Sequence, residues 1–289
     1  MRSRCNDANE SMDKRIYDCF CYFNENMVLE LRLETLWDYI DYFVIAEAVY
    51  TQVGNPKPLN FDVNRFAKYK SKIRYLTVDR FPPGPMSPWK NENYQRNCLI
   101  DGLYDATNDD WVIVSDLDEI PRPETIQLYD PKRYKRADFQ QKAYAYYLNN
   151  LLMDGDRAAA WFGSKITTYR YLKEFFGTAT AVRSYKSSGL LRVLRRTWFK
   201  TFHVQVIKDG GWHFTWMLKP ENIVTKMEAI AEQHVVKEEF KKLDYIQTKI
   251  SAGEDVLNPK SHYIREEVVE SVFPSYLIAH RNKYREWFR

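Results

Sequence analysis

Several features that would place this sequence in a familiar class are missing from it. No apolar run comes near the roughly 20 residues that a membrane-spanning helix requires. The N-terminal stretch MRSRCNDANESMDKR also lacks the hydrophobic segment of a signal peptide. We therefore expect a cytoplasmic protein with no transmembrane segment, in which residues 1–14 form a flexible lead.

Cysteine is scarce, which bears on the redox compartment. The chain has four cysteines, and none of them stands in the CxxC spacing of a metal site. Cys19 and Cys21 lie two residues apart in an expected strand, so they face the same side and are poorly placed to bridge each other. We expect all the thiols to be reduced, which agrees with a cytosolic compartment.

A dense basic stripe is absent as well. Lys and Arg number 43 against 39 Asp and Glu, and the net charge of +4 is too mild for a nucleic-acid-binding protein. What the sequence does have is aromatic side chains, at 16% of residues, with 21 Tyr and 8 Trp. Such side chains either fill a large core or stack on sugar rings and bases.

The first half alternates between short apolar strands and amphipathic helices. Near-continuous apolar strands separated by helices are typical of a parallel sheet that is covered on both faces. We predict an α/β fold, with a mostly parallel mixed sheet flanked by helices, in a single domain over 15–289. The expected strands are 16–23, 42–48, 72–78 and 111–115, and the expected helices are 24–39 and 89–106.

The second half is less regular. Strands are expected at 137–149 and 158–166, and a helix is expected at 222–242. Residues 202–216 predict a hairpin or strand pair that turns at Asp209-Gly210-Gly211. No repeat or low-complexity segment marks a domain boundary.

Three acids follow the strand at 111–115, in the stretch VIVSDLDEIPRPE. Asp116, Asp118 and Glu119 would repel one another unless a cation lay between them. Asp116 and Asp118 point to the same side of an extended segment, where two carboxylates could seat Mg²⁺ or Mn²⁺. The alternative is a solvated acidic loop, and we expect Glu119 to pair with Arg122 or with a helix start.

Six stretches between Ile16 and Trp216 together resemble glycosyltransferase family 17. In order they read IYDCFCYFNENMVLELRLETLWDYIDYFVIAEA, TQVGNPKPLNF, WKNENYQRNCLIDGL, VIVSDLDEIP, YYLN and GGWHFTW. The resemblance implies a GT-A-like fold, in which a Rossmann-type nucleotide-sugar half (about 15–125) joins an acceptor half (about 126–289). From this resemblance we expect a compact member without the membrane anchor of Golgi members, similar to bacterial or virus-encoded relatives.

The resemblance also implies a reaction. A metal-dependent inverting glycosyltransferase would move a sugar from a UDP-sugar donor to a hydroxyl of a glycan or glycoprotein acceptor, with Mn²⁺ or Mg²⁺ as the cofactor. GlcNAc is the donor sugar by family default, and xylose or another hexose is the alternative. Asp116 and Asp118 match the family's DxD metal motif, and His213 in GGWHF would complete the site or else be a core histidine.

Other residues are candidates for binding the donor. Besides Asp116, they are Glu47, Gln95, Arg96 and Lys226. Glu47 ends a strand where packing does not explain its charge, so it would hydrogen-bond the base or ribose. Arg96 suits either a pyrophosphate or a salt bridge to the acidic cluster, and Lys226 suits either a phosphate or a solvated helix face.

Inversion requires a carboxylate that deprotonates the acceptor hydroxyl. The candidates are Asp209, beside two glycines, and Asp154 or Asp156 in the MDGD loop. Each of them could instead be a turn-forming aspartate. Two other functions remain open: a nucleotidyl or phosphoryl transferase, against which the lack of a GxxxxGK[ST] loop counts, and a non-catalytic carbohydrate-binding protein.

Overall fold

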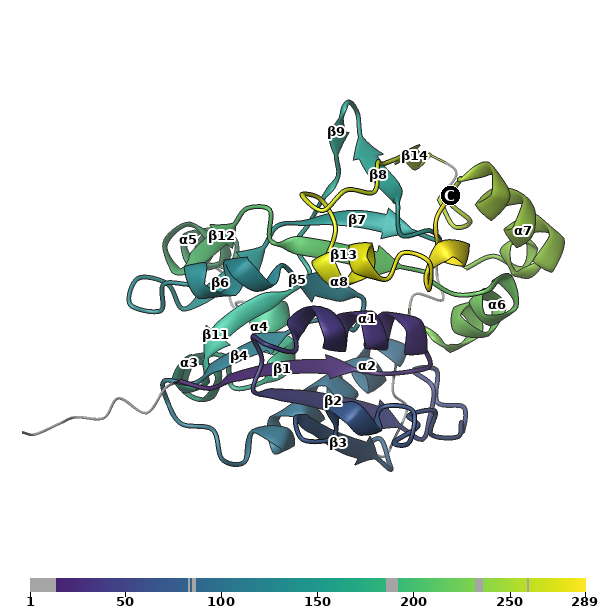
Figure 1. Ribbon diagram of the computed structural model, residues 1–289. Helices are drawn as coiled ribbons and strands as arrows, with labels where there is room; N and C mark the ends of the chain where they lie inside the picture. Colours follow the sequence, from purple (N-terminus) through teal and green to yellow (C-terminus); the bar gives the residue numbers. More distant parts are fainter. Residues whose placement is uncertain (1–13, 83, 85–86, 186–191, 232–235, 259) are drawn as a thin grey trace, which may run out of the picture.

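The structure is a computed structural model, and it describes residues 14–289 apart from 83, 85–86, 186–191, 232–235 and 259 (Figure 1). The helices are α1 Asn26–Leu36, α2 Pro88–Cys98, α3 Tyr169–Tyr171, α4 Ala179–Arg183, α5 Arg192–His203, α6 Pro220–Ala229, α7 Leu243–Ala252 and α8 Ser275–Ala279. The strands are β1 Ile16–Cys21, β2 Tyr42–Ala48, β3 Ile73–Val78, β4 Trp111–Val114, β5 Glu119–Pro121, β6 Arg136–Phe139, β7 Gln141–Ala145, β8 Asn150–Asp154, β9 Arg157–Ala158, β10 Ala160–Trp161, β11 Lys165–Thr168, β12 Val204–Ile207, β13 Gly211–Thr215 and β14 His262–Arg265.

The first sheet has the strand order β12-β6-β11-β4-β1-β2-β3. Its centre is parallel: β1 pairs with both β2 and β4, and β2 pairs with β3. β12 and β6 are also parallel, whereas β11 runs antiparallel to both of its neighbours. The predicted α/β fold with a mostly parallel mixed sheet is therefore confirmed for this sheet.

Helices cover both faces of the first sheet because alternate strand residues point to opposite sides. Phe20 and Ile45 lie in a buried core together with the leucines of α1. Cys19 and Val44 lie in a second core, into which α2 and α4 also pack. The apolar strands therefore have no solvated face, as their continuous hydrophobic sequence requires.

The second sheet has the strand order β14-β8-β7-β13-β5, with β9 and β10 pairing to β8 and β7. The chain passes from one sheet to the other four times through short links: 115–118, 140, 162–164 and 208–210. Gly211 permits the last of these, since it has φ +127° and a Cβ there would lie 2.2 Å from the Ile120 carbonyl oxygen.

These crossings correct three predictions about the second half. The expected strand at 137–149 divides into β6 and β7, which belong to different sheets. The expected strand at 158–166 divides in the same way between β9, β10 and β11. The hairpin at 202–216 is wrong, because β12 pairs with β6 whereas β13 pairs with β7 and β5.

The helix predicted over 222–242 is also wrong as a single element. α6 ends at Ala229, residues 232–235 lie outside the described part of the chain, and a short 3₁₀ helix follows at Glu238–Lys241. Helix α7 then begins at Leu243, and α6 and α7 pack with the end of β7 in a third, smaller core.

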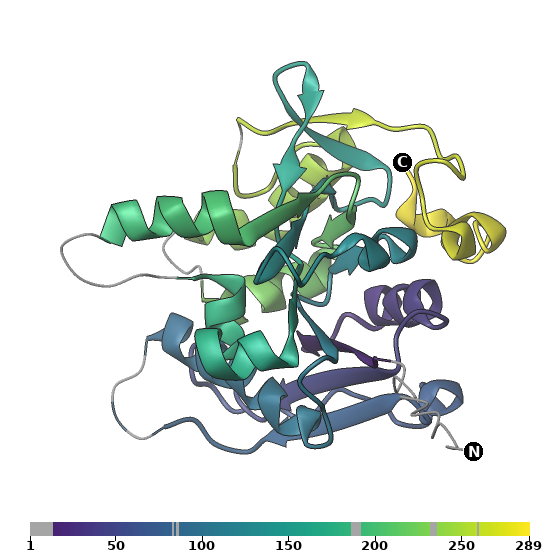
Figure 2. The same ribbon diagram turned by 90° about the vertical axis from the view of Figure 1, so that its left-hand side faces the viewer.

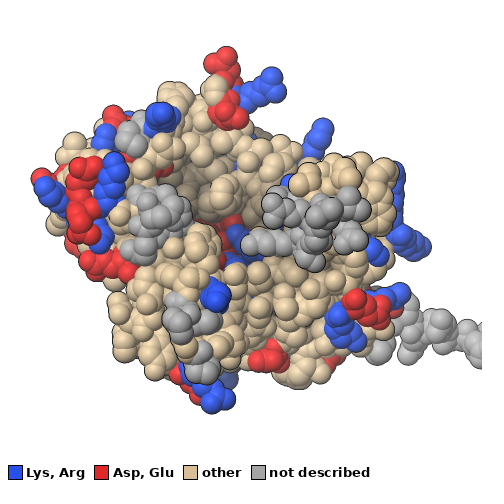
Figure 3. Space-filling view, turned by 180° about the vertical axis from the view of Figure 1, so that it is seen from behind, with Lys and Arg blue, Asp and Glu red and all other residues tan. Residues whose placement is uncertain are grey.

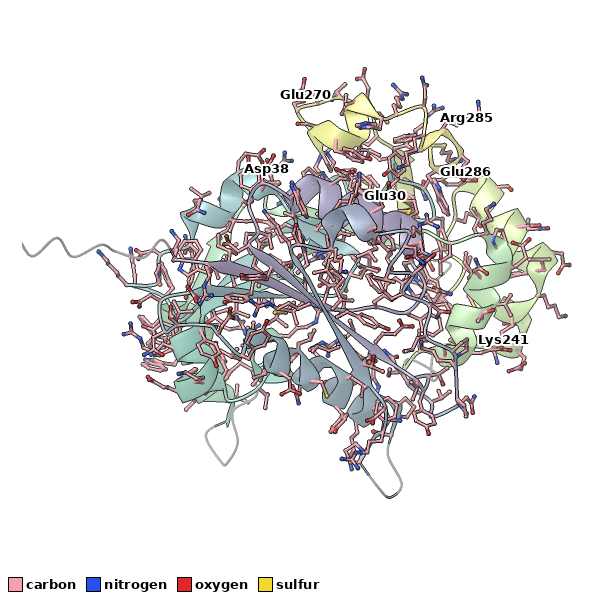
Figure 4. The ribbon with its side chains drawn as sticks, turned by 60° about the horizontal axis from the view of Figure 1, so that its bottom comes forward. Glu30, Asp38, Lys241, Glu270, Arg285 and Glu286 are labelled. Atoms are coloured by element: carbon pink, nitrogen blue, oxygen red, sulfur yellow. The ribbon has the colours of Figure 1, made fainter. Side chains whose placement is uncertain are left out.

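The C-terminal segment packs against α1. Leu277 of α8 and Tyr284 are buried in the same core as the α1 leucines, and Lys283 forms an ion pair with Glu30. Figure 4 shows Glu30 on α1 near the segment that carries Arg285 and Glu286. This cover places the inner face of α1 deep inside the molecule.

The described cysteines, Cys19, Cys21 and Cys98, are free thiols, and Cys5 lies outside the described residues. Burial raises the pKa of Cys21 to about 12, so its thiol stays protonated at neutral pH. Across the described ranges, no helix has both the length and the apolar character to cross a membrane.

Candidate functional site

A cleft with a volume of about 370 Å³ lies where β1, β2 and β4 end. In sheets of this kind ligands bind outside the carboxyl ends of the parallel strands. Figure 3 shows acidic and basic side chains at the floor of a central hollow. The charged and aromatic residues that line the cleft are Tyr22, Phe23, Glu25, Tyr50, Lys57, Glu92, Arg96, Asp116, Asp118, Trp161, His213, Trp216 and Lys226.

Arg32, on α1, is fully buried and fixes the loop that follows β4. Its guanidinium donates to both carboxylate oxygens of Asp18, at 2.6 and 2.7 Å. It also donates to the carbonyl oxygens of Asp116 and Leu117 at 3.0 Å and of Glu119 at 2.9 Å. One planar group with five donors thus pairs carbonyls that the loop would otherwise leave unpaired in the interior.

Two further arginines hold two of the three acids. Arg183, at the end of α4, donates to both carboxylate oxygens of Glu119 and to Asp116. Nη2 of Arg96, on α2, lies 3.1 Å from Oδ1 of Asp116, which is the salt bridge that the sequence offered as one alternative for Arg96. The predicted pairing of Glu119 with Arg122 is wrong.

Glu119 is the most tightly held of these acids. It is fully buried and also accepts the backbone N–H of Asp116 and the indole N–H of Trp161, both at 2.8 Å. Burial alone would raise the pKa of Glu119, but the charge and hydrogen bonds of Arg183 hold it well below its usual range. Glu119 is therefore an ionised structural group that shapes the loop.

Asp118 has a different environment. Its carboxylate lines the cleft, and Nε2 of His213 lies 3.6 Å from its Oδ1. Among the described residues no hydrogen bond is donated to this carboxylate. Burial raises the pKa of Asp118, and the charges of Glu119 and Asp116 add to that effect, while His213 and Lys226 oppose it.

His213, on β13, is held by stacking. Its ring lies on that of Trp161, with centroids 4.4 Å apart and planes at 18°. Its Nδ1 is buried, and it has no hydrogen-bond partner within the described ranges. The stack fixes the ring plane and leaves Nε2 directed toward Asp118.

The predicted metal trio of Asp116, Asp118 and His213 is not assembled. No group of three His, Cys, Asp or Glu side chains that could hold a metal ion occurs in the described part of the chain. The physical reason is that Asp116 is ion-paired with Arg96 and Arg183. Asp118 and His213 remain as a pair whose carboxylate and imidazole donors would suit a divalent cation such as Mn²⁺.

Two predicted donor-binding residues besides Arg96 and Asp116 line the cleft. Nζ of Lys226 lies 3.0 Å from Oε1 of Glu25. Burial opposes the charge of Lys226, but Glu25 and then Asp118 outweigh it and raise the Lys226 pKa, so the amine stays charged. Gln95 donates its amide to the Ala46 carbonyl oxygen at 3.0 Å, which ties α2 to the end of β2.

Glu47, in contrast, does not line the cleft. It is fully buried and accepts from Nζ of Lys57 at 2.6 Å, the N–H of Asn60 at 2.7 Å, the N–H of Phe61 at 3.0 Å and the Tyr75 hydroxyl at 2.9 Å. Its charge is therefore explained by the loop that it organises, and the predicted contact with base or ribose is not supported.

The candidate general bases also lie outside the cleft. The side chain of Asp209 is 67% exposed and pairs with Arg122, and its φ of +49° is that of a turn. Asp154 ends β8 and faces Arg157 across an exposed hairpin that also contains Asp156. Their positions fit the turn-forming alternative rather than catalysis.

Sequence reasoning missed two of the three arginines that organise the site. Arg32 did leave a signal, because it stands on the apolar face of α1, three residues after Leu29 and four before Leu36. Arg183 left none, because it reaches Glu119 across 64 residues of sequence. Trp161 was likewise not among the site residues that the sequence predicted.

The comparisons with known proteins give the class first. Residues 5–175 match the model of glycosyltransferase family 17, and the chain belongs to that family. It is 25% identical over 304 residues to the β-1,4-mannosyl-glycoprotein 4-β-N-acetylglucosaminyltransferases of Rattus norvegicus and Mus musculus. The match covers 94% of this chain and 54% of each relative, so the chain spans about half the length of these relatives.

Solved structures resemble the chain more loosely. S. aureus TarS 1–349 has a TM-score of 0.37 and 14% identity, over 80% of this chain and 69% of that one. Glucosyl-3-phosphoglycerate synthase from Mycobacterium tuberculosis, in complex with Mn²⁺, UDP-glucose and glycerol 3-phosphate, has a TM-score of 0.38 and 12% identity, over 92% of both chains.

Proposed function

We propose that this chain transfers a sugar from a UDP-sugar to a glycan hydroxyl, with inversion and with Mn²⁺ or Mg²⁺ bound. The observation that carries the proposal is the Asp118–His213 pair on the wall of the cleft, with 3.6 Å between Oδ1 and Nε2. The names of the similar transferases support GlcNAc as the donor sugar and a mannosyl glycoprotein as the acceptor.

In this proposal Asp118 and His213 hold the cation, which supplies positive charge to the departing diphosphate. Lys226, which Glu25 keeps charged, adds a second positive group in the cleft. Trp216 lines the same cleft and offers an aromatic face on which a base or sugar ring can stack. Arg32 holds the loop so that Asp118 stays at the cleft.

The test is UDP binding by calorimetry, with Mn²⁺ and with EDTA, together with UDP release from UDP-GlcNAc, UDP-glucose, UDP-galactose and UDP-xylose. Asp118→Asn keeps the shape of the side chain and removes its charge. We expect turnover to fall at least about 100-fold, since even residues behind a metal ligand are worth about 10- to 100-fold. EDTA should weaken UDP binding to wild type and leave the UDP affinity of Asp118→Asn unchanged.

Asp209→Asn and Asp154→Asn are the matched controls, because both remove an exposed acid that does not line the cleft. Each should keep wild-type turnover. UDP affinity that is the same with Mn²⁺ and with EDTA would refute the cation site. Binding of free sugars without any nucleotide would favour a carbohydrate-binding protein instead.

A further inference from the structure

Helix α5 exposes an apolar stripe that nothing in the proposed reaction explains. Leu194, Trp198 and Phe202 are 66%, 55% and 59% exposed. They follow one another at intervals of four residues, so they lie along one side of the helix. The rings of Trp198 and Phe202 have centroids 6.2 Å apart, which makes the stripe continuous.

The stripe is not the result of a helix that has failed to pack. Phe199 of α5 is buried, and its ring stacks on those of Phe175 and Tyr185, with centroids 5.5 and 4.2 Å apart. The carbonyl oxygen of His203 accepts the N–H of Lys135, at 3.0 Å, which ties the end of α5 to the first sheet. One side of α5 is therefore anchored through Phe199, and the adjoining side presents large apolar groups to solvent.

The charge of the helix points to its partner. The α5 sequence, RVLRRTWFKTFH, contains four Arg and Lys residues and no acid, although the whole chain is nearly balanced with 43 basic and 39 acidic residues. Lys132 and Arg133, both exposed, stand just before the Lys135 contact at the end of α5. Figure 2 shows α5, in green, projecting from the side of the molecule.

We propose that α5 docks the protein on a membrane surface that carries anionic lipid headgroups. A helix with Trp, Phe and Leu along one side and several Arg and Lys in its sequence lies in the plane of the bilayer interface, with its apolar side among the acyl chains. Tryptophan suits that boundary because its ring is apolar and its N–H is polar. The basic residues add attraction to the negative surface. A protein partner would not require this excess of one charge.

Sedimentation with vesicles tests the proposal directly. Vesicles of phosphatidylcholine with about one-third phosphatidylglycerol should bind the full chain at low salt, and vesicles of pure phosphatidylcholine should bind it much less. The double variant Trp198→Ala/Phe202→Ala should lower partitioning at least about tenfold. Lys200→Ala should lower it about fivefold on anionic vesicles, which corresponds to about 1 kcal/mol per charge near the surface.

The matched control is Trp89→Ala/Tyr104→Ala, which removes two exposed aromatic side chains elsewhere on the surface. It should bind vesicles as wild type does. No binding to anionic vesicles, or an equal loss in the control, would overturn the proposal. Light scattering tests the alternative that α5 joins two copies of the chain. If wild type is a dimer and the Trp198→Ala/Phe202→Ala variant is a monomer, α5 is a dimer interface and the membrane proposal is wrong.

Discussion

Asp118 and Glu119 are adjacent in the chain, yet their carboxylates have opposite environments. Glu119 is fully buried, and its oxygens accept from Arg183, Trp161 and the Asp116 N–H. Asp118 lines the cleft, and its Oδ1 lies 3.6 Å from Nε2 of His213. The surroundings therefore lower the pKa of Glu119 and raise that of Asp118. A run of acids is thus two environments, one in which Glu119 builds the loop and one in which Asp118 faces the cleft.

Removing the group that supports both sites should have the largest effect. Arg32→Met leaves Asp18 buried without its cation and three loop carbonyls without a donor. We expect about 3–5 kcal/mol of lost stability, the usual cost of breaking a buried ion pair. Urea unfolding measures it. Lys68→Met, which removes an ion pair whose lysine is 61% exposed, should cost less than about 1 kcal/mol, and equal losses would contradict the assignment.

Glu119→Gln attacks the structural site alone. Gln keeps one acceptor oxygen but removes the charge that pairs with buried Arg183, so we expect about 2–3 kcal/mol of lost stability at pH 7. Because folding lowers the pKa of Glu119, its carboxylate stabilises the folded state at pH values above its unfolded-state pKa of about 4.3. This stabilisation is lost as the pH falls from there toward the lower folded-state pKa. Unfolding curves of the two proteins should therefore converge in acid. A difference that stays constant down to pH 3 would count against this.

Trp161→Phe tests the residue that touches both sites. The change removes the indole N–H that donates to Glu119 at 2.8 Å and keeps a ring to stack on His213. Because Glu119 keeps its bonds from Arg183 and from the Asp116 N–H, we expect a cost of only about 1 kcal/mol. UDP affinity with Mn²⁺ should change little, whereas Trp161→Ala should weaken it. Equal affinity in both variants would show that the stack does not position His213.

Asp118→Asn should have the smallest effect on folding and the opposite sign. Because folding raises the pKa of Asp118, the ionised carboxylate lowers the stability of the folded state. This loss of stability is complete at pH values above the folded-state pKa and is absent below the unfolded-state pKa of about 3.9. Without metal, the variant should be more stable than wild type at pH 7 by less than about 1 kcal/mol. The advantage should vanish in acid. Early unfolding of the variant would make Asp118 a structural residue like Glu119.

The sequence predicted the centre of the first sheet well because local signals determine it. Strands β1, β2 and β4 each lie in a single, mostly apolar run bounded by polar residues, and the acids directly follow β4. The second half was predicted less well because its strands change sheets within a few residues. No periodicity reveals that β6 pairs with β11 and β12 while β7, which begins two residues after β6 ends, joins another sheet.

The candidate site divides in the same way. Asp118, His213 and Lys226 were found by residue type and by family resemblance, and all three line the cleft. Glu47 was misread because its partners are backbone groups of a loop 13 and 14 residues further on. Whether a charged side chain meets a ligand or an arginine depends on contacts between distant segments, which composition and spacing do not encode.

The four short crossings between the sheets also limit which segments of this chain can be exchanged with those of a relative. Asp118 lies within one crossing, Trp161 directly precedes another, and His213 soon follows a third. A chimera that exchanged residues 126–289 between two relatives would also exchange β6, β11 and β12 of the first sheet. We therefore expect such a chimera to fold poorly where single substitutions are tolerated, because its two sheets would each combine strands from both parents.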